Sequence, residues 1–198
     1  METGTQMKTL FTLALAAAAG LQAATYEIDS AHSSANFKVR HMMVANVSGT
    51  FSKVTGNVVF DPKNLAASKV DATIDVNSVN TQQEKRDAHL KSPDFFDVAK
   101  YPAMTFKSKK FAAAGAGKYK VTGDLTIHGV TKEVVLDLTD VTAETKGMGG
   151  ETRIGGQAST TINRKEFGLT WSKTLDGGGA VVGDDVTINI EMELVKKS

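Results

Sequence analysis

Apolar and polar residues alternate with a period of two along most of the chain. Between Ser34 and His41, the residues Ala35, Phe37 and Val39 fall on one side and polar residues fall between them. This period is typical of a β-strand with one buried face. The same alternation predicts strands at residues 70–76, 119–127 and 186–194, and further strands around residues 49–60, 104–111, 132–142 and 153–163.

Eight or nine such strands with little helix predict an all-β protein, either a sandwich or a barrel. Several predicted strands approach ten residues, and long strands suit a closed barrel, which leaves no exposed edge. A barrel of about eight strands can hold one small ligand inside. Glycines at 149–150 and 177–179 mark turns, and no repeat or linker divides the chain. We therefore expect a single domain.

Residues 81–91 depart from this alternation. Thr81 and Glu84 have the spacing of a capping box at the start of a helix. The segment contains few apolar residues, so the helix should be mostly solvent-exposed. We interpret residues 81–91 as a short helix that caps one end of the barrel, with Phe95 and Phe96 turned inward as a stopper.

The first residues have the pattern of a secretory signal peptide. Lys8 precedes an unbroken apolar run at residues 10–20, and Ala23 and Ala24 follow it. The run is too short to cross a bilayer as a helix. We expect export and cleavage after Ala23. The predicted organisation is a signal peptide at residues 1–23 with an upstream extension at residues 1–6, followed by one barrel domain at residues 24–198.

Composition excludes several functional classes. Lys and Arg number 23 against 22 Asp and Glu, so the net charge of +1 provides no field to attract nucleic acid. The chain has no cysteine, which excludes disulfides, thiol catalysis and thiolate metal sites. Beyond the terminal run, no apolar stretch is long enough to span a membrane.

Five segments, taken together and in this order, resemble the YceI-like family. They cover essentially the whole mature chain and lie at residues 26–41, 47–61, 86–102, 123–134 and 163–171. The resemblance implies a lipocalin-like antiparallel β-barrel in the periplasm. It also implies a binder of long apolar chains, such as polyisoprenoids, quinone precursors, fatty acids or fatty amides, without enzymatic activity or a cofactor.

We therefore expect a periplasmic binding or carrier protein with an isoprenoid or fatty-acyl lipid in the barrel interior. A different interpretation is a stress-related structural or protein-interaction barrel whose interior is packed and holds no lipid. A third is a hydrolase or isomerase that acts on the same lipid. The alternation does not distinguish a cavity wall from a solid core, and a homodimer is compatible with either.

The polar residues offer few candidates for chemistry. No histidine pair has the i, i+4 spacing of a helical zinc site, so no metal site is expected. His32 and His128 lie near predicted turns and are interpreted as hydrogen-bonded corners. His41 shares the apolar side of its strand, where it either contacts the ligand or is satisfied by neighbouring groups. No nucleophile elbow or phosphate loop is present, so no enzyme is expected.

Arg86 and His89 are three residues apart and so share one face of the predicted helix. They could bind a polar head group together. Alternatively, Arg86 forms an ion pair that fixes the helix to the barrel, with Asp87, Asp94 or Asp97 as its partner. Arg164 carries the same two interpretations.

The remaining candidates are apolar side chains that fall on the inward side of strands or near a barrel end. With the polar residues His41, Arg86 and His89 included, sixteen residues are predicted to bind the ligand. They are Phe37, His41, Phe51, Phe60, Ile74, Arg86, His89, Phe95, Phe96, Tyr101, Phe106, Tyr119, Leu125, Trp171, Ile188 and Ile190.

Overall fold

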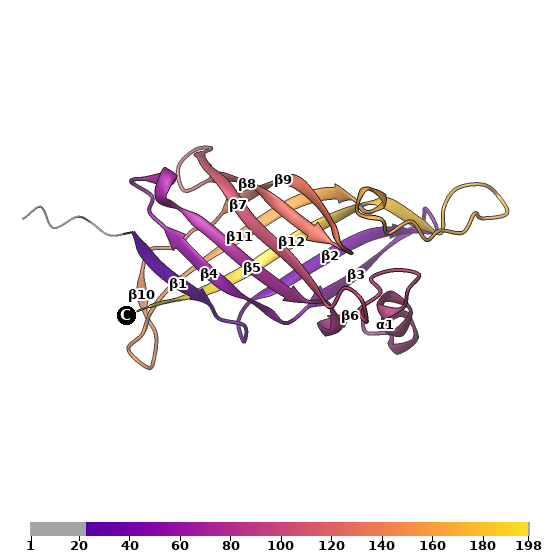
Figure 1. Ribbon diagram of the computed structural model, residues 1–198, viewed down its shortest axis with the longest axis horizontal. Coiled ribbons are helices and arrows are strands. Elements are labelled where there is room, and N and C mark those ends of the chain that lie inside the picture. Colours follow the sequence, from indigo (N-terminus) through magenta and orange to yellow (C-terminus); the bar gives the residue numbers. More distant parts are fainter. Residues whose placement is uncertain (1–22, 198) are drawn as a thin grey trace, which may run out of the picture.

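The computed structural model describes residues 23–197, and the predicted signal peptide lies outside them except for Ala23. Within these residues, twelve strands form one antiparallel sheet (Figure 1). The strands are β1 (Ala24–Ile28), β2 (Ser34–His41), β3 (Ala45–Phe51), β4 (Val54–Phe60), β5 (Lys69–Asp75), β6 (Val79–Asn80), β7 (Ala103–Ala113), β8 (Tyr119–Ile127), β9 (Val130–Thr139), β10 (Thr145–Lys146), β11 (Thr152–Asn163) and β12 (Val182–Lys196). The helical elements are η1 (Leu65–Ala67), η2 (Val76–Ser78), α1 (Glu84–Lys91) and η3 (Arg164–Phe167).

The sheet closes on itself where β11 pairs with β12. This pairing runs without interruption from Arg153 opposite Val195 to Asn163 opposite Asp185. From β11 the ring continues through β9, β8, β7, β5, β4 and β1, and returns to β12. Eight strands therefore surround the interior, and the prediction of a closed antiparallel barrel of about eight strands is confirmed.

Strands β2, β3 and β6 extend the barrel at one end. β12 pairs with β2 at residues 182–191 and with β1 at residues 194–196, so β1 and β2 follow one another along one side of β12. β3 and β4 are separated by Ser52 and Lys53, and β5 and β6 by η2. Three neighbouring positions of the barrel are thus occupied by strands that bend in the middle, and their outer halves lie near α1 (Figure 1).

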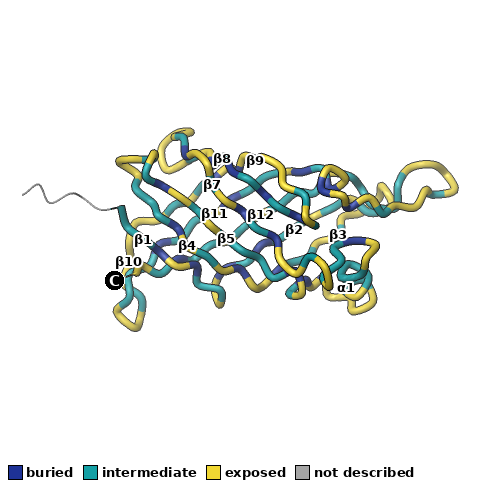
Figure 2. The backbone as a smooth tube through the Cα atoms, in the orientation of Figure 1, coloured by how far each residue is buried: buried dark blue, intermediate teal, exposed yellow. Residues whose placement is uncertain are grey.

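Alternation along the strands sorts side chains between the interior and solvent, as predicted. In β8, Val121, Leu125 and Ile127 are buried, whereas Lys120 is exposed and the residues that alternate with them are only half-buried. This strand occupies residues 119–127, the range that its alternation predicts. Buried or half-buried apolar positions recur along the wall strands (Figure 2), and these side chains form one apolar cluster around a common interior.

The predicted capping box at Thr81 is wrong. The helix begins at Glu84, and its N-cap is Gln83, whose side-chain oxygen accepts a hydrogen bond of 2.6 Å from the backbone N–H of Arg86. Gln82 adopts a left-handed backbone with φ of 60°, which separates Thr81 from the helix. Thr81 is buried, and its backbone N–H donates to Asp87 instead. The helix itself has no buried residue, as predicted.

Gly56 in β4 generates a stability prediction. Its φ is +144°, and a Cβ at this position would lie 2.1 Å from the backbone oxygen of Asp71 on the neighbouring strand. Gly56→Ala should therefore lower the free energy of unfolding by roughly 2–4 kcal/mol, as measured by urea denaturation. Gly177→Ala is the matched control, because no atom lies within 4 Å of its added Cβ. Equal stability of the two variants would contradict the described backbone of β4.

Candidate functional site

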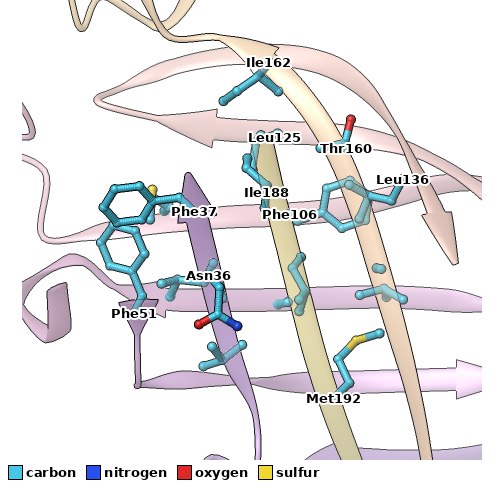
Figure 3. A pocket seen from close by; sticks show the side chains of 18 of the residues that line it. Asn36, Phe37, Phe51, Phe106, Leu125, Leu136, Thr160, Ile162, Ile188 and Met192 are labelled. Atoms are coloured by element: carbon cyan, nitrogen blue, oxygen red, sulfur yellow. The ribbon is translucent and has the colours of Figure 1, made fainter. Parts of the chain in front are cut away.

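The barrel encloses an apolar cavity of about 220 Å³. A single water molecule needs roughly 10–15 Å³ by the same measure, so the space is far larger than a packing defect. Figure 3 shows side chains from opposite walls, such as Phe106 on β7 and Ile188 on β12, around it. Besides two glycines, the lining residues that are not apolar are Asn36, Thr105, Thr160 and Arg164. The wall is therefore suited to hydrocarbon.

The cavity is long because every second residue of the wall strands contributes to it. On β12 the lining residues run from Val182 to Leu194, a distance of roughly 40 Å along a strand. Barrel strands tilt by about 40° from the axis, so this corresponds to roughly 30 Å of barrel length. On β11 the lining residues run from Ile154 to Ile162 with the same period of two. An extended chain fits this shape better than a compact molecule does.

Aromatic side chains form one end of the cavity. The rings of Phe37 and Phe51 have centroids 5.7 Å apart, and Phe51 meets Phe96 edge-to-face at 5.6 Å. Phe96 follows α1, and both Phe95 and Leu90 line the cavity from the same segment. This placement agrees with the interpretation of the two phenylalanines as a stopper.

A second aromatic group ties the α1 segment to the long connection between β11 and β12. His89, Phe95 and Trp171 contact one another, with ring centroids 5.0–5.1 Å apart in each pair. Trp171 belongs to the β11–β12 connection, whereas His89 lies in α1. The two segments that cover this end of the barrel are therefore held together by ring contacts.

The structure places ten of the sixteen predicted ligand-binding residues on the cavity wall. They are Phe37, Phe51, Phe60, Ile74, Phe95, Phe96, Phe106, Leu125, Ile188 and Ile190. The other six lie outside the wall: His41, Arg86, His89, Tyr101, Tyr119 and Trp171. Contact of any of the sixteen residues with a ligand stays a prediction.

Three of the six residues that lie outside the cavity wall have local contacts that account for their position. Tyr119 packs edge-to-face on Phe60 at 5.4 Å, at the start of β8. Tyr101 packs on His128 at 4.5 Å, near the β8–β9 turn. His41 is the last residue of β2 and pairs with Val182, so it lies at the edge of the interior.

The side chains of Arg86 and His89 contact different residues near the helix and do not form a joint site. The Nε and Nη2 atoms of Arg86 donate to the hydroxyl and the carbonyl of Thr81, at 2.7 and 2.8 Å. Among the described residues Arg86 forms none of the predicted ion pairs with Asp87, Asp94 or Asp97; it donates to Thr81, whose hydroxyl in turn donates to Asp87. His89 Nε2 lies 2.8 Å from Asp94.

Arg164 is a buried cation at the end of the cavity. Its five donors all face acceptors of the protein: Nη1 the carbonyls of Leu169 and Trp171, Nε that of Gly183, and Nη2 the carbonyl of Val182 and the carboxylate of Asp184. Burial lowers the pKa of its guanidinium, and Asp184 opposes this effect. Arg164 therefore joins the β11–β12 connection to β12 and has no donor left for a head group.

Most wall residues outside the predicted set are aliphatic or small. Met104, Leu136, Ile162 and Met192 line the cavity, as does the hydroxyl-bearing Thr160. Each falls on the inward phase of its strand, so the alternation that predicts the strands would also have identified them. The predicted ligand-binding set lacks them because it consists mainly of aromatic residues.

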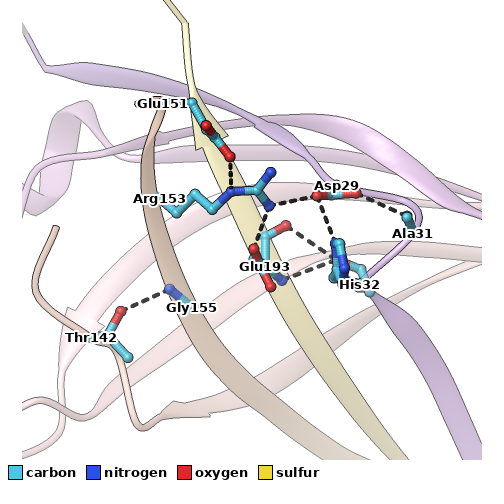
Figure 4. A network of polar contacts seen from close by, with 9 residues as sticks. Asp29, Ala31, His32, Thr142, Glu151, Arg153, Gly155 and Glu193 are labelled. Carbon is cyan, nitrogen blue, oxygen red and sulfur yellow. Dashed lines mark hydrogen bonds and ion pairs between the residues drawn. The ribbon is translucent and has the colours of Figure 1, made fainter. Parts of the chain in front are cut away.

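A polar network outside the cavity joins the β1–β2 turn to β11 and β12 (Figure 4). Arg153 donates to Asp29 at 2.6 Å, to Glu151 at 2.7 Å and to Glu193. Asp29, Glu193 and His32 lie close enough to resemble a metal site. The guanidinium of Arg153 already forms ion pairs with both carboxylates, so we interpret the group as a structural ion network.

His32 is the hydrogen-bonded corner that its position predicts. Its Nδ1 lies 2.9 Å from the Asp29 carboxylate. The hydrogen bond with His32, followed by that with Arg153, holds the pKa of Asp29 well below its usual range. The same bond with Asp29 raises the pKa of His32 above its usual value of 6.5.

The sequence model of a family described as the YceI-like domain matches residues 26–194. A UPF0312 protein of Vibrio parahaemolyticus, VPA0850, is 42% identical over 159 residues, which cover 79% of this chain and 84% of that protein. A UPF0312 protein of Staphylococcus aureus, SA2479, is 36% identical over 168 residues, which cover 85% of this chain and 95% of that protein.

Solved structures share the barrel. BcnA of Burkholderia cenocepacia superimposes with a TM-score of 0.73 at 29% identity, covering 84% of this chain and 98% of that chain. The YCEI protein of Campylobacter jejuni gives a TM-score of 0.66 at 39% identity, covering 80% and 90%. A domain from Saccharophagus degradans, described as a polyisoprenoid binding domain, gives 0.64 at 18% identity, covering 87% and 98%. The last likeness concerns the fold alone.

Arg164 generates the next prediction. Arg164→Met leaves several buried carbonyls without donors, so the free energy of unfolding should fall by roughly 3 kcal/mol in urea denaturation. Lys165→Met is the control, because Lys165 is exposed and also contacts Asp184, at 2.9 Å. Its loss should stay below about 1 kcal/mol. If Arg164→Met were no more harmful than Lys165→Met, Arg164 would not hold this end of the barrel together.

The His32–Asp29 contact predicts a pH dependence of stability. Because folding raises the pKa of His32, protonated His32 stabilises the fold below about pH 6.5, and this contribution is lost as pH rises through the higher folded-state pKa. The urea midpoint of His32→Gln should therefore change less than that of the wild type as pH rises above about 6.5. Identical pH profiles of the two proteins would show that the contact does not affect stability.

Proposed function

The chain belongs to the YceI-like family, and from this premise we propose that it is a periplasmic binding or carrier protein for a long apolar lipid. The polyisoprenoid or fatty-acyl chain lies in the barrel interior and undergoes no chemistry. The observation that carries the proposal is the long cavity with its almost wholly apolar wall.

The free energy of chain burial favours a long ligand. Burial of one methylene contributes about 0.8 kcal/mol, so fifteen carbons contribute roughly 12 kcal/mol. Association costs about 4–15 kcal/mol of translational, rotational and ordering entropy. A short chain would therefore bind weakly, whereas a chain that fills the length of the cavity would bind tightly.

The wall provides no binding site for a charged head group. Arg164 has its donors occupied, and Asn36, Thr105 and Thr160 carry the only other polar side chains among the described lining residues. Burying an unpaired charge in such surroundings is strongly unfavourable. The head group therefore lies at an end of the barrel, and the hydrocarbon chain supplies the affinity.

Two further observations support this function. The structural neighbour from Saccharophagus degradans is described as a polyisoprenoid binding domain, which suggests the class of chain. The described lining residues include no histidine or carboxylate, so the hydroxyls of Thr105 and Thr160 have no general base on the wall to activate them for a reaction on the buried chain. The contrasting interpretation, a packed interaction barrel, does not account for the cavity.

Native mass spectrometry of the purified protein tests the proposal. The expected spectrum contains a species heavier than the polypeptide by the mass of one long-chain lipid, and organic extraction removes that difference. The same spectrum reports whether the protein is a dimer. A protein that carries no lipid as purified and takes up none from added polyisoprenol or fatty acid would contradict the proposal.

Filling the cavity distinguishes a hollow barrel from a packed one. Ala158 is buried and lines the cavity on β11, whereas Ala112 on β7 does not line it. Ala158→Leu should reduce lipid uptake severalfold without lowering the free energy of unfolding of the lipid-free protein, and Ala112→Leu should leave uptake unchanged. In a packed interior, the extra methyl groups of Ala158→Leu would instead cost about 1–3 kcal/mol of stability.

A further inference from the structure

The tip of the β2–β3 hairpin exposes three large apolar side chains in a row. Met42 is 44% exposed, Met43 57% and Val44 75%. Among the other described residues, Val135 and Met148 are the only large apolar side chains exposed to a similar degree, and each stands alone. Because these side chains are exposed, packing in the core of the protein does not explain why the hairpin tip is apolar.

The backbone of the tip makes its sequence more unusual. Met42 and Met43 have φ of 49° and 59°, and the N–H of Val44 donates to the carbonyl of His41. This is a tight turn with positive φ at both central residues, a backbone for which glycine and asparagine are strongly preferred. Two methionines occupy left-handed positions here without a folding advantage, which indicates a role for their side chains in contact with another surface.

Two contacts hold the tip in place. The guanidinium of Arg40 donates to the carbonyl of Met43 at 2.9 Å. The N–H of Met42 donates to the carbonyl of Val181 at 2.8 Å, which joins the tip to the β11–β12 connection. The methionines are thus presented by a fixed backbone.

The tip lies at the same end of the barrel as α1 and the β11–β12 connection (Figure 1). Val39 lines the cavity three residues before Met42, and Val182, also on the wall, pairs with His41. The exposed tip therefore continues directly from the cavity wall. Whatever the tip contacts is brought to this end of the cavity.

The charge around the tip favours an anionic partner. Residues 34–51 contain Lys38 and Arg40, both exposed, and no Asp or Glu. The neighbouring connection adds exposed Lys173 and exposed Asp176, which offset one another. β12 beside the hairpin adds Asp184, which pairs with Arg164 and Lys165, and exposed Asp185, so the basic side chains still outnumber the unpaired acidic ones. An exposed apolar group flanked by basic side chains is typical of elements that enter the interface of an anionic bilayer.

We propose that residues 42–44 anchor this end of the barrel on an anionic phospholipid surface, so that the lipid chain passes between membrane and cavity without crossing water. The proposal rests on the proposed function, because a carrier of an insoluble chain must meet a membrane to load or unload it. Met42, Met43 and Val44 enter the acyl boundary, and Lys38 and Arg40 face the anionic head groups.

Cosedimentation of the purified protein with vesicles tests the anchor. Vesicles of phosphatidylethanolamine and phosphatidylglycerol should bind the wild type, and added salt or neutral phosphatidylcholine vesicles should weaken the binding. The test variant is Met42→Asn with Met43→Gly, which introduces the residues that this turn prefers, so the fold is preserved or stabilised. Its partition coefficient should fall about tenfold or more.

Met148→Ser is the matched control. Met148 is fully exposed in the β10–β11 connection, at the opposite end of the barrel (Figure 1), so its loss should leave vesicle binding unchanged. Equal binding by the hairpin variant and the wild type, or no vesicle binding by the wild type, would overturn the anchor. So would dimerisation through the tip without vesicle binding. The lipid content of the purified protein is a separate measurement, so failure of the anchor and failure of the carrier function are distinguishable.

Discussion

Pairing of β11 with β12 is the interaction on which the rest of the structure depends. It closes the sheet over eleven residue pairs, from Arg153 with Val195 to Asn163 with Asp185. Once the sheet is closed, the alternation of each strand directs its apolar residues towards a common axis. Because side chains from opposite walls do not fill that axis, the closed sheet encloses a hydrocarbon-lined space rather than a solid core.

Polar interactions are confined to the margins of this space. Arg153 draws the carboxylates of Asp29, Glu151 and Glu193 together outside the cavity and joins the β1–β2 turn to β11 and β12. Arg164 satisfies carbonyls of the β11–β12 connection and of β12 at the cavity end. Both arginines support the closed sheet, and neither offers a free charge to the interior. The wall is therefore able to hold a chain but not a buried ionic group.

The sequence predicted the features that depend on local pattern. The range of β8 and the inward phase of residues such as Leu125 and Ile188 follow from alternation alone. β6 and β10 have two residues each, too few to show a period. The carbonyl partners of Arg164 lie in residues 169–183 and become neighbours only when β11 and β12 pair. Thr81 failed as a cap because Gln82 turns left-handed, which composition does not reveal. Whether inward residues meet or leave a space depends on the geometry of the whole ring.

The most direct test of this account is xenon binding to crystals of the delipidated protein. A dry apolar cavity of this size binds xenon, whereas a packed core or a water-filled channel does not concentrate it. The account predicts xenon density inside the barrel, among Leu125, Ile188 and Met192. Side-chain density that fills the same region from wall to wall, with no xenon, would contradict it.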